Sequence, residues 1–206
     1  RKEAENLIGH LPDYFFEIPA SNTGKYHPDY ALGKEGLVRH TKAAVRIAND
    51  LLRLGMFKGL LKNKDIIITA LILHDGWKHG VDYQPYAKAQ HPIIAAERVK
   101  DYSIDKELGS QIADLILTHM GQWNVNGKKS KYKPLDKPVT KEQKLLHWCD
   151  YLASRAEIDL SKYLNVEDFN KNYGKVQLIV LFKDTEIKET IHSLLKDVDE
   201  LNKNYI

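Results

Sequence analysis

Two residues of the kind that bind metals end the most apolar segment of the chain. His74 and Asp75 directly follow residues 66–73, a run of Ile, Leu and Ala with one Thr that belongs in a protein core. An imidazole and a carboxylate are costly to bury alone, so this doublet needs a cation or a hydrogen-bonding group beside it. Other side chains that could share such a cation are His40, His91, His119 and Asp150. His and Asp suit Mn, Fe, Mg, Zn or Co, and the set indicates a metal-assisted hydrolase.

These candidate ligands share one feature: they fall on or beside the apolar faces of expected helices. His40 lies on the inner side of an expected helix over 37–52, and His119 follows Leu115 by about one helical turn. A single histidine in such a place is usually a core residue with a satisfied hydrogen bond. Four or more such groups need one another, or a cation, to offset their desolvation. We therefore predict metal binding by His40, His74, Asp75 and Asp150.

Three segments of the chain resemble one superfamily of enzymes. They are GLVRHT at 36–41, LHDGWK at 73–78 and HWCDYLA at 147–153. Their order of His, then His-Asp, then Asp is similar to that of the HD-domain metal-dependent phosphohydrolases. Together with FFEIPAS at 15–21 and LTHMG at 117–121, they most resemble the catalytic domain of bacterial HD-type 3′–5′ exoribonucleases, over about residues 15–157.

The resemblance implies an all-α fold, an HD-domain helical bundle, in which the four residues predicted above hold one divalent ion. In two-metal members of the superfamily, two more histidines lie between the doublet and the last aspartate, and His91 and His119 match them. Asp75 would then bridge both ions. His91 precedes Pro92 at an expected helix start, so a capping or solvent-exposed role is the alternative for it. The expected cofactor is one or two divalent metals per chain, with Mn favoured.

Two cations are candidates for contact with a phosphate. Lys78 follows the doublet by three residues, and the resemblance associates a cation at this position with the reacting phosphate. A lysine ammonium can stabilise negative charge that develops on oxygen, so Asp75 and Lys78 are our candidate catalytic residues. Arg155 lies just beyond the last aspartate of the motif, where it could reach a phosphate or pair with a neighbouring carboxylate.

Residues 127–134 form a basic loop that contains one tyrosine. Lysines with an interleaved aromatic suit a single-stranded backbone and a stacked base, although a charge run of this kind is more often a solvated loop. Lys128, Lys129 and Lys131 are therefore candidate substrate contacts. Trp123 stands near a predicted ligand, where it could stack a base, wall a pocket or pack in the core.

Most of the elements that must position these residues are predicted to be helices. Apolar periodicity and capping residues predict helices over 37–52, 92–101, from an N-cap at Ser103 toward His119, from Thr140 through about 157, and over about 184–203. Segment 65–75 suits a buried strand as well as a helix, with Asp65 and Gly76 favouring the helix, and 175–182 is equally ambiguous. The long polar loops fall over 20–36, 76–91 and 121–139, and such loops are often functional.

Length and composition limit the classes of protein to which this chain can belong. A chain of 206 residues with 43% hydrophobic and 29% charged residues predicts one globular domain, which we place at 1–160 with a C-terminal helical extension at 161–206 packed on it. The net charge of +3 tolerates a phosphate-bearing partner without demanding one. A single cysteine, Cys149, excludes an internal disulfide and fits a reducing, cytoplasmic compartment. No segment approaches the about 20 apolar residues of a membrane span, so no membrane partner is expected.

These features lead to three hypotheses. The first is a divalent-metal-dependent phosphohydrolase or phosphodiesterase, a nuclease in the broad sense, that acts on nucleotides or nucleic-acid 3′ ends. The second is a small-molecule nucleotidase or nucleoside triphosphate hydrolase whose lysine loop closes over phosphates. The third is a non-catalytic regulatory module that keeps the HD fold, and the complete ligand set argues against it. The expected partner is a phosphate-bearing small molecule or a single-stranded nucleic acid, and the sequence leaves the oligomeric state open.

Overall fold

The computed structural model of the protein describes residues 1–124 and 135–158. All regular structure within these residues is helical, as the sequence predicted. The α-helices are α1 (Lys2–Ile8), α2 (Gly36–Leu51), α3 (Lys64–Leu73), α4 (His91–Tyr102), α5 (Lys106–Leu117) and α6 (Lys141–Ala153). Short 3₁₀ helices are η1 (Asp13–Phe16), η2 (Asp29–Ala31), η3 (Gly55–Asn63), η4 (Gly121–Asn124) and η5 (Ala156–Ile158). Residues Arg1–Glu157 form one compact unit.

Some sequence predictions lie outside the described residues. These are the lysine loop with Lys128, Lys129 and Lys131, the segment 175–182, and the C-terminal extension 161–206 with its expected helix. No helix within the described part of the chain is long and apolar enough to cross a membrane.

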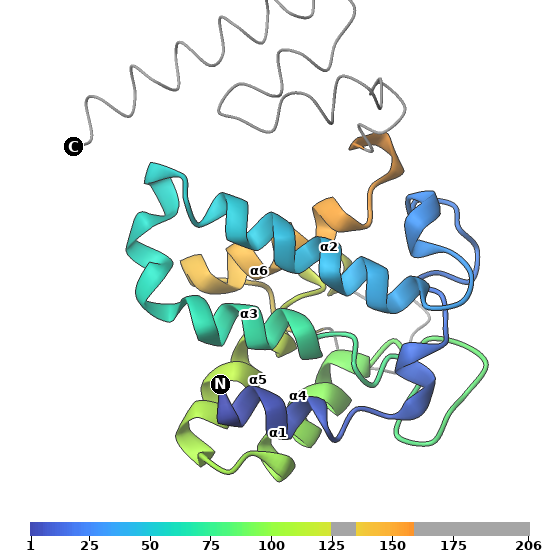
Figure 1. Cartoon of the computed structure of the whole chain (residues 1–206), viewed down its shortest axis with the longest axis horizontal. Coiled ribbons are helices and arrows are strands. Elements are labelled where there is room, and N and C mark those ends of the chain that lie inside the picture. Colours follow the sequence, from blue (N-terminus) through green and yellow to red (C-terminus); the bar gives the residue numbers. More distant parts are fainter. Residues whose placement is uncertain (125–134, 159–206) are drawn as a thin grey trace, which may run out of the picture. The chain divides into compact units, whose positions relative to one another are not determined.

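Helix α3 lies at the centre of the bundle and packs against α1, α2, α5 and α6 (Figure 1). A helix that is contacted on several sides must be apolar around most of its circumference, and α3 reads KDIIITALIL. Ile67, Leu71 and Leu73 are fully buried in it. This settles the alternative between strand and helix for segment 65–75 in favour of the helix. The end of α3 delivers His74 and Asp75 to the interior.

The other helices form pairs around α3. Helix α2 packs beside α6, and α4 packs on α5 (Figure 1). The predicted capping box opens α6, because Thr140 Oγ1 accepts from Gln143 N at 3.1 Å and Gln143 Oε1 accepts from Thr140 N at 3.1 Å. These reciprocal bonds satisfy two N–H groups that the helix start leaves free. The pairing of α2 with α6 brings His40 and Asp150, the first and last residues of the His, His-Asp, Asp pattern, close together.

Two helix ends differ from the predictions. Ser103 does not cap α5, because Asp105 Oδ1 accepts from the first-turn N–H groups at 3.0 Å while Ser103 Oγ donates to Val99 O at 2.6 Å and closes α4. A carboxylate is the stronger acceptor for a helix start. Helix α6 ends at Ala153 rather than near 157, because Tyr30 Oη donates to Ala153 O at 2.8 Å and takes up one of its last carbonyls.

The loop over 20–36 is fastened to α2 and to the end of α6. The Arg39 guanidinium donates to Tyr30 O at 2.6 Å, Leu32 O at 2.9 Å and Lys34 O at 2.7 Å. Tyr26 O accepts from the backbone N–H of Ala156 at 2.7 Å. A long polar loop is thereby held in one position beside the motif residues.

Candidate metal centre

The predicted ligands meet at one place in the structure. They come from different elements: His40 from α2, His74 and Asp75 from the end of α3, His91 from the start of α4, His119 from the end of α5 and Asp150 from α6. All are buried except Asp150, whose side chain is 19% exposed. A cleft of about 470 Å³ opens over them and is lined in part by Asp75, His91, His119 and Asp150. His91 is therefore neither a solvent-exposed nor an N-capping histidine.

The donor atoms form two groups that share one carboxylate. The donors of His40, His74 and Asp75 all lie within 4.8 Å of one another, and so do those of Asp75, His91 and His119. Asp75 Oδ1 is 3.0 Å from His91 Nε2, whereas its Oδ2 is 3.6 Å from His74 Nε2. The two oxygens of Asp75 thus face different groups, which is the arrangement expected of a bridging ligand.

Asp150 joins the first of these groups. Its Oδ1 lies 3.0 Å from His40 Nε2 and 3.4 Å from His74 Nε2. The structure therefore gathers the complete His, His-Asp, Asp pattern around one point, although it spans 110 positions of the chain.

Backbone carbonyls fix the protonation pattern of three of these histidines. The Nδ1–H groups of His74, His91 and His119 donate to the carbonyl oxygens three residues earlier, at 2.6, 2.7 and 2.7 Å. Because the proton of a neutral imidazole is used at Nδ1, the Nε2 atom carries a lone pair. Each of these rings consequently presents Nε2 as a metal-binding atom.

The Nε2 atoms of His91 and His119 face each other beside the carboxylate of Asp75. His91 Nε2 and His119 Nε2 are 3.0 Å apart, and they lie 3.0 and 3.8 Å from Asp75 Oδ1. His74 Nε2 is buried without a hydrogen-bond partner. A proton on one ring would satisfy one of these contacts, whereas divalent cations would satisfy all of them together. The donor set, imidazole nitrogen with carboxylate oxygen, fits such ions.

The electrostatics of the centre hold three of the predicted ligands in their binding forms. Burial acts to raise the pKa of Asp75 and of Asp150, but neighbouring positive groups outweigh it and hold both well below the usual range. Burial, together with neighbouring histidines, lowers the pKa of His119 to about 3, so this ring stays neutral. His74 is the exception, since burial lowers its pKa but the two carboxylates outweigh this and raise it to about 9. A cation must displace that proton to bind His74.

The predicted substrate contacts that the structure describes lie in the cleft. Lys78, 15% exposed, places Nζ 2.6 Å from Asp75 Oδ2. Trp123 lines the cleft and is 56% exposed, so it is not a core residue. The guanidinium of Arg155 lies over the rings of Tyr26 at 5.2 Å and Tyr151 at 4.8 Å. Within the described residues Arg155 pairs with no carboxylate, and its hydrogen bonds go to the neighbouring serine hydroxyl at 3.3 Å.

Two further histidines line the cleft, and the sequence analysis assigned neither a role. His147 Nδ1–H donates to His119 O at 2.8 Å, which links the cleft wall to a ligand. The ring of His27 lies 5.7 Å from that of His40. Burial, followed by the positive influence of His40 and Lys78, lowers the pKa of His27 to about 4. The only signal for His27 was its place in the long polar loop 20–36.

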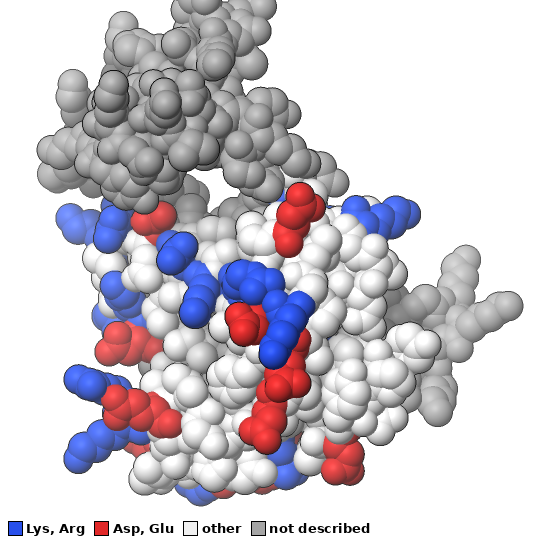
Figure 2. Space-filling model, turned by 45° about the vertical axis from the view of Figure 1, so that its right-hand side comes forward, with Lys and Arg blue, Asp and Glu red and all other residues white. Residues whose placement is uncertain are grey.

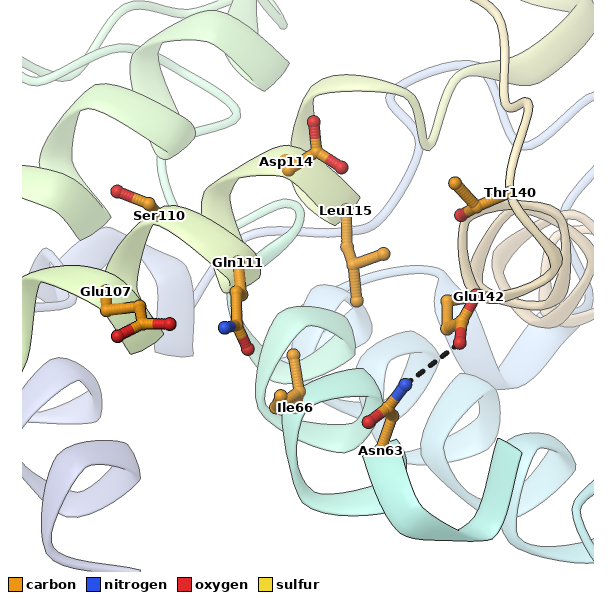
Figure 3. A pocket seen from close by; sticks show the side chains of 9 residues that line it. All are labelled: Asn63, Ile66, Glu107, Ser110, Gln111, Asp114, Leu115, Thr140 and Glu142. Atoms are coloured by element: carbon orange, nitrogen blue, oxygen red, sulfur yellow. Dashed lines mark hydrogen bonds between the residues drawn. The ribbon is translucent and has the colours of Figure 1, made fainter. Parts of the chain in front are cut away.

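A second hollow of about 570 Å³ lies among α3, α5 and the start of α6 (Figure 3). Two of its carboxylates already accept hydrogen bonds, Glu142 from Asn63 at 2.9 Å and Asp114 from Gln143 at 2.9 Å. Its described lining contains neither His nor Cys. The metal chemistry therefore belongs to the first cleft.

Comparison with known families matches residues 37–155 to the HD domain. The chain belongs to the HD domain family. HD domains are in general metal-dependent phosphohydrolases that bind divalent metals. No curated protein and no solved structure matches the chain. All the predicted ligands lie within the matched HD segment, whereas His27 precedes it.

Proposed function

We propose that this HD-domain protein is a divalent-metal-dependent phosphodiesterase that acts on nucleotides and, above all, on the 3′ ends of nucleic acids. The observation that carries the proposal is the 3.0 Å approach of His91 Nε2 to His119 Nε2 beside the buried carboxylate of Asp75. Burying two lone pairs and an anion together is costly unless a proton or a cation lies between them, and divalent cations would satisfy all three groups at once.

The proposed ligand sets follow the two donor groups. His40, His74, Asp75 and Asp150 would hold one ion, and Asp75, His91 and His119 would hold a second. When bound, divalent ions supply Lewis-acid chemistry, since they stabilise charge on phosphoryl oxygens and make water more acidic. Imidazole and carboxylate donors suit Mn, Fe, Mg, Zn and Co, and Mn is our first choice for loading.

The protein's own cations would bind and orient the phosphate. Lys78 faces the cleft beside Asp75, where its ammonium can stabilise negative charge on a phosphate oxygen. The guanidinium of Arg155 lies over two tyrosine rings, and its N–H donors can bind a non-reacting phosphate. Trp123 offers an exposed ring on which a base can stack.

The size of the cleft suits a single nucleotide, either free or at the end of a strand. A volume of about 470 Å³ lies in the range of small-molecule sites, which suits a terminal nucleotide. Figure 2 shows Lys and Arg interspersed with Asp and Glu, so the face it draws is not uniformly basic. The resemblance of the motif segments to HD-type exoribonucleases supports a 3′ end rather than a free nucleotide.

Product analysis tests this function. Protein loaded with Mn²⁺ is incubated with short single-stranded RNA, single-stranded DNA, nucleoside triphosphates and cyclic dinucleotides, and the products are separated by chromatography. We expect mononucleotides to be released stepwise from the 3′ end of a strand. Asp75→Asn should be inactive, while Asp50→Asn, at a carboxylate that is 76% exposed, should keep full activity. Turnover of triphosphates alone would favour the nucleotidase, and metal binding without any turnover would favour the regulatory module.

A further inference from the structure

A histidine outside the ligand set stands in the wall of the same cleft. His27 lines the cleft, and its ring lies 5.7 Å from that of His40 at an angle of 57°. It belongs to neither group of donors that lie within 4.8 Å of one another. It also precedes the matched HD segment 37–155. His27 is thus close to the metal centre without being one of its ligands.

Backbone hydrogen bonds hold this histidine in place from both sides. Tyr26 O accepts from Ala156 N at 2.7 Å, and Pro28 O accepts from Ala31 N at 2.9 Å. The backbone that carries His27 is therefore fixed beside the cleft before a ligand arrives, so little backbone conformational entropy is lost when the ligand binds.

The two ring nitrogens of His27 have different surroundings. Nδ1 is buried and has no hydrogen-bond partner. Nε2 is not fully buried, and it makes no hydrogen bond to any residue that the structure describes. A buried N–H without a partner is rarer in proteins than a buried acceptor without one, so the lone pair belongs at Nδ1 and the proton at Nε2. A ring that lines the cleft therefore carries its N–H on the nitrogen that is not buried.

We propose that His27 is a substrate-contacting residue whose Nε2–H donates a hydrogen bond to an oxygen of the phosphate group bound at the metal centre. This assignment rests on the proposed function. Phosphate oxygens are strong acceptors, and hydrogen bonds to charged groups are shorter and stronger than neutral ones. Lys78 lines the same cleft and already supplies a positive charge for the phosphate. A neutral donor adds to phosphate binding without adding a positive charge that would compete with the metals.

Three substitutions separate hydrogen bonding from ring packing. His27→Ala removes the ring, His27→Phe keeps an aromatic ring against His40 but loses the donor, and His27→Gln restores an N–H donor. Binding of inorganic phosphate to the Mn²⁺-loaded full chain is measured by calorimetry. We expect the Ala and Phe variants to bind phosphate about 10- to 100-fold more weakly, and the Gln variant to recover most of the loss. His10→Ala, at an exposed histidine that does not line the cleft, should behave as wild type.

Metal content and turnover complete the test. Elemental analysis should give the same metal per chain for all variants, and kcat/KM for bis(4-nitrophenyl) phosphate should fall in parallel with phosphate affinity. Phosphate binding needs no turnover, so a wild-type protein that hydrolyses nothing would refute the proposed function and leave this measurement intact. The assignment of His27 is overturned if His27→Phe binds phosphate as wild type does. Loss of metal from His27→Ala, or no phosphate binding by the metal-loaded wild type, would overturn it equally.

Discussion

Gly121 is the position where we expect one added methyl group to disturb the metal centre. Its φ of +52° is in the left-handed region, and a Cβ added to it would overlap the ring of His147 at Cε1, Nδ1 and Nε2. That ring donates to His119 O at 2.8 Å. Gly121→Ala should therefore push His147 aside and strain the backbone next to a predicted ligand.

The magnitude follows from two separate costs. An alanine in the left-handed conformation costs roughly 1–2 kcal/mol. Overpacking against a buried ring adds about 1–3 kcal/mol. Gly33 provides the matched control, because its φ is +66° but a Cβ added there meets nothing within 4 Å. Gly33→Ala should lower the free energy of unfolding by the first cost alone, and Gly121→Ala by both.

Urea unfolding of the two variants and the wild type, all metal-free, measures these costs. Elemental analysis after Mn²⁺ loading should then show full metal binding by Gly33→Ala and reduced binding by Gly121→Ala, since only the second change acts on the residue bonded to His119 O. Equal losses in the free energy of unfolding would show that the His147 ring yields without cost, and the reasoning about this contact would be refuted.

Three further predictions address the centre and its surroundings. His74 has a pKa of about 9 and is charged at pH 7, so metal binding should release a proton. The apparent metal affinity should therefore rise about tenfold per pH unit from pH 7 to 9. Calorimetry in buffers of different ionisation enthalpy measures the number of protons released. Asp75→Asn removes the charge that both donor groups share, and it should weaken metal binding by more than about 100-fold in a competition with a chelating dye, whereas unchanged affinity would remove Asp75 from the ligands. Burial raises the pKa of the Cys149 thiol to about 12, so Ellman's reagent should label it only after unfolding in urea, and rapid labelling of the native protein would contradict its placement in the core.

The sequence could predict the parts of the fold that depend on residues close to one another in the chain. The capping box at Thr140 uses residues three apart, and helical periodicity placed α2 and α4 to within a residue or two. The ambiguity between helix and strand over 65–75 could not be resolved locally, because α3 is apolar on all sides. It is resolved by the four helices that surround α3.

The features that sequence missed depend on distant contacts. The end of α6 is set by a hydroxyl of Tyr30, 123 positions from the carbonyl it binds. Ser103 and Asp105 are both suitable N-caps by residue type, and the choice between them is made when Ser103 closes the preceding helix. His27 belongs to no periodic pattern. Hydrogen bonds that fasten its loop to α2, to the end of α6 and to Ala156 bring it to the cleft.

The predicted ligands are spread over five helices and their ends, from His40 in α2 to Asp150 in α6. Bound ions would therefore act as crosslinks between segments that the unfolded chain does not gather. By mass action, an ion at 1,000 times its dissociation constant would add about 4 kcal/mol to the free energy of unfolding, a large share of the stability of an ordinary domain. The supply of metal would then govern how much of this protein survives proteolysis, and a metal-starved cell would lose the protein itself as well as its activity.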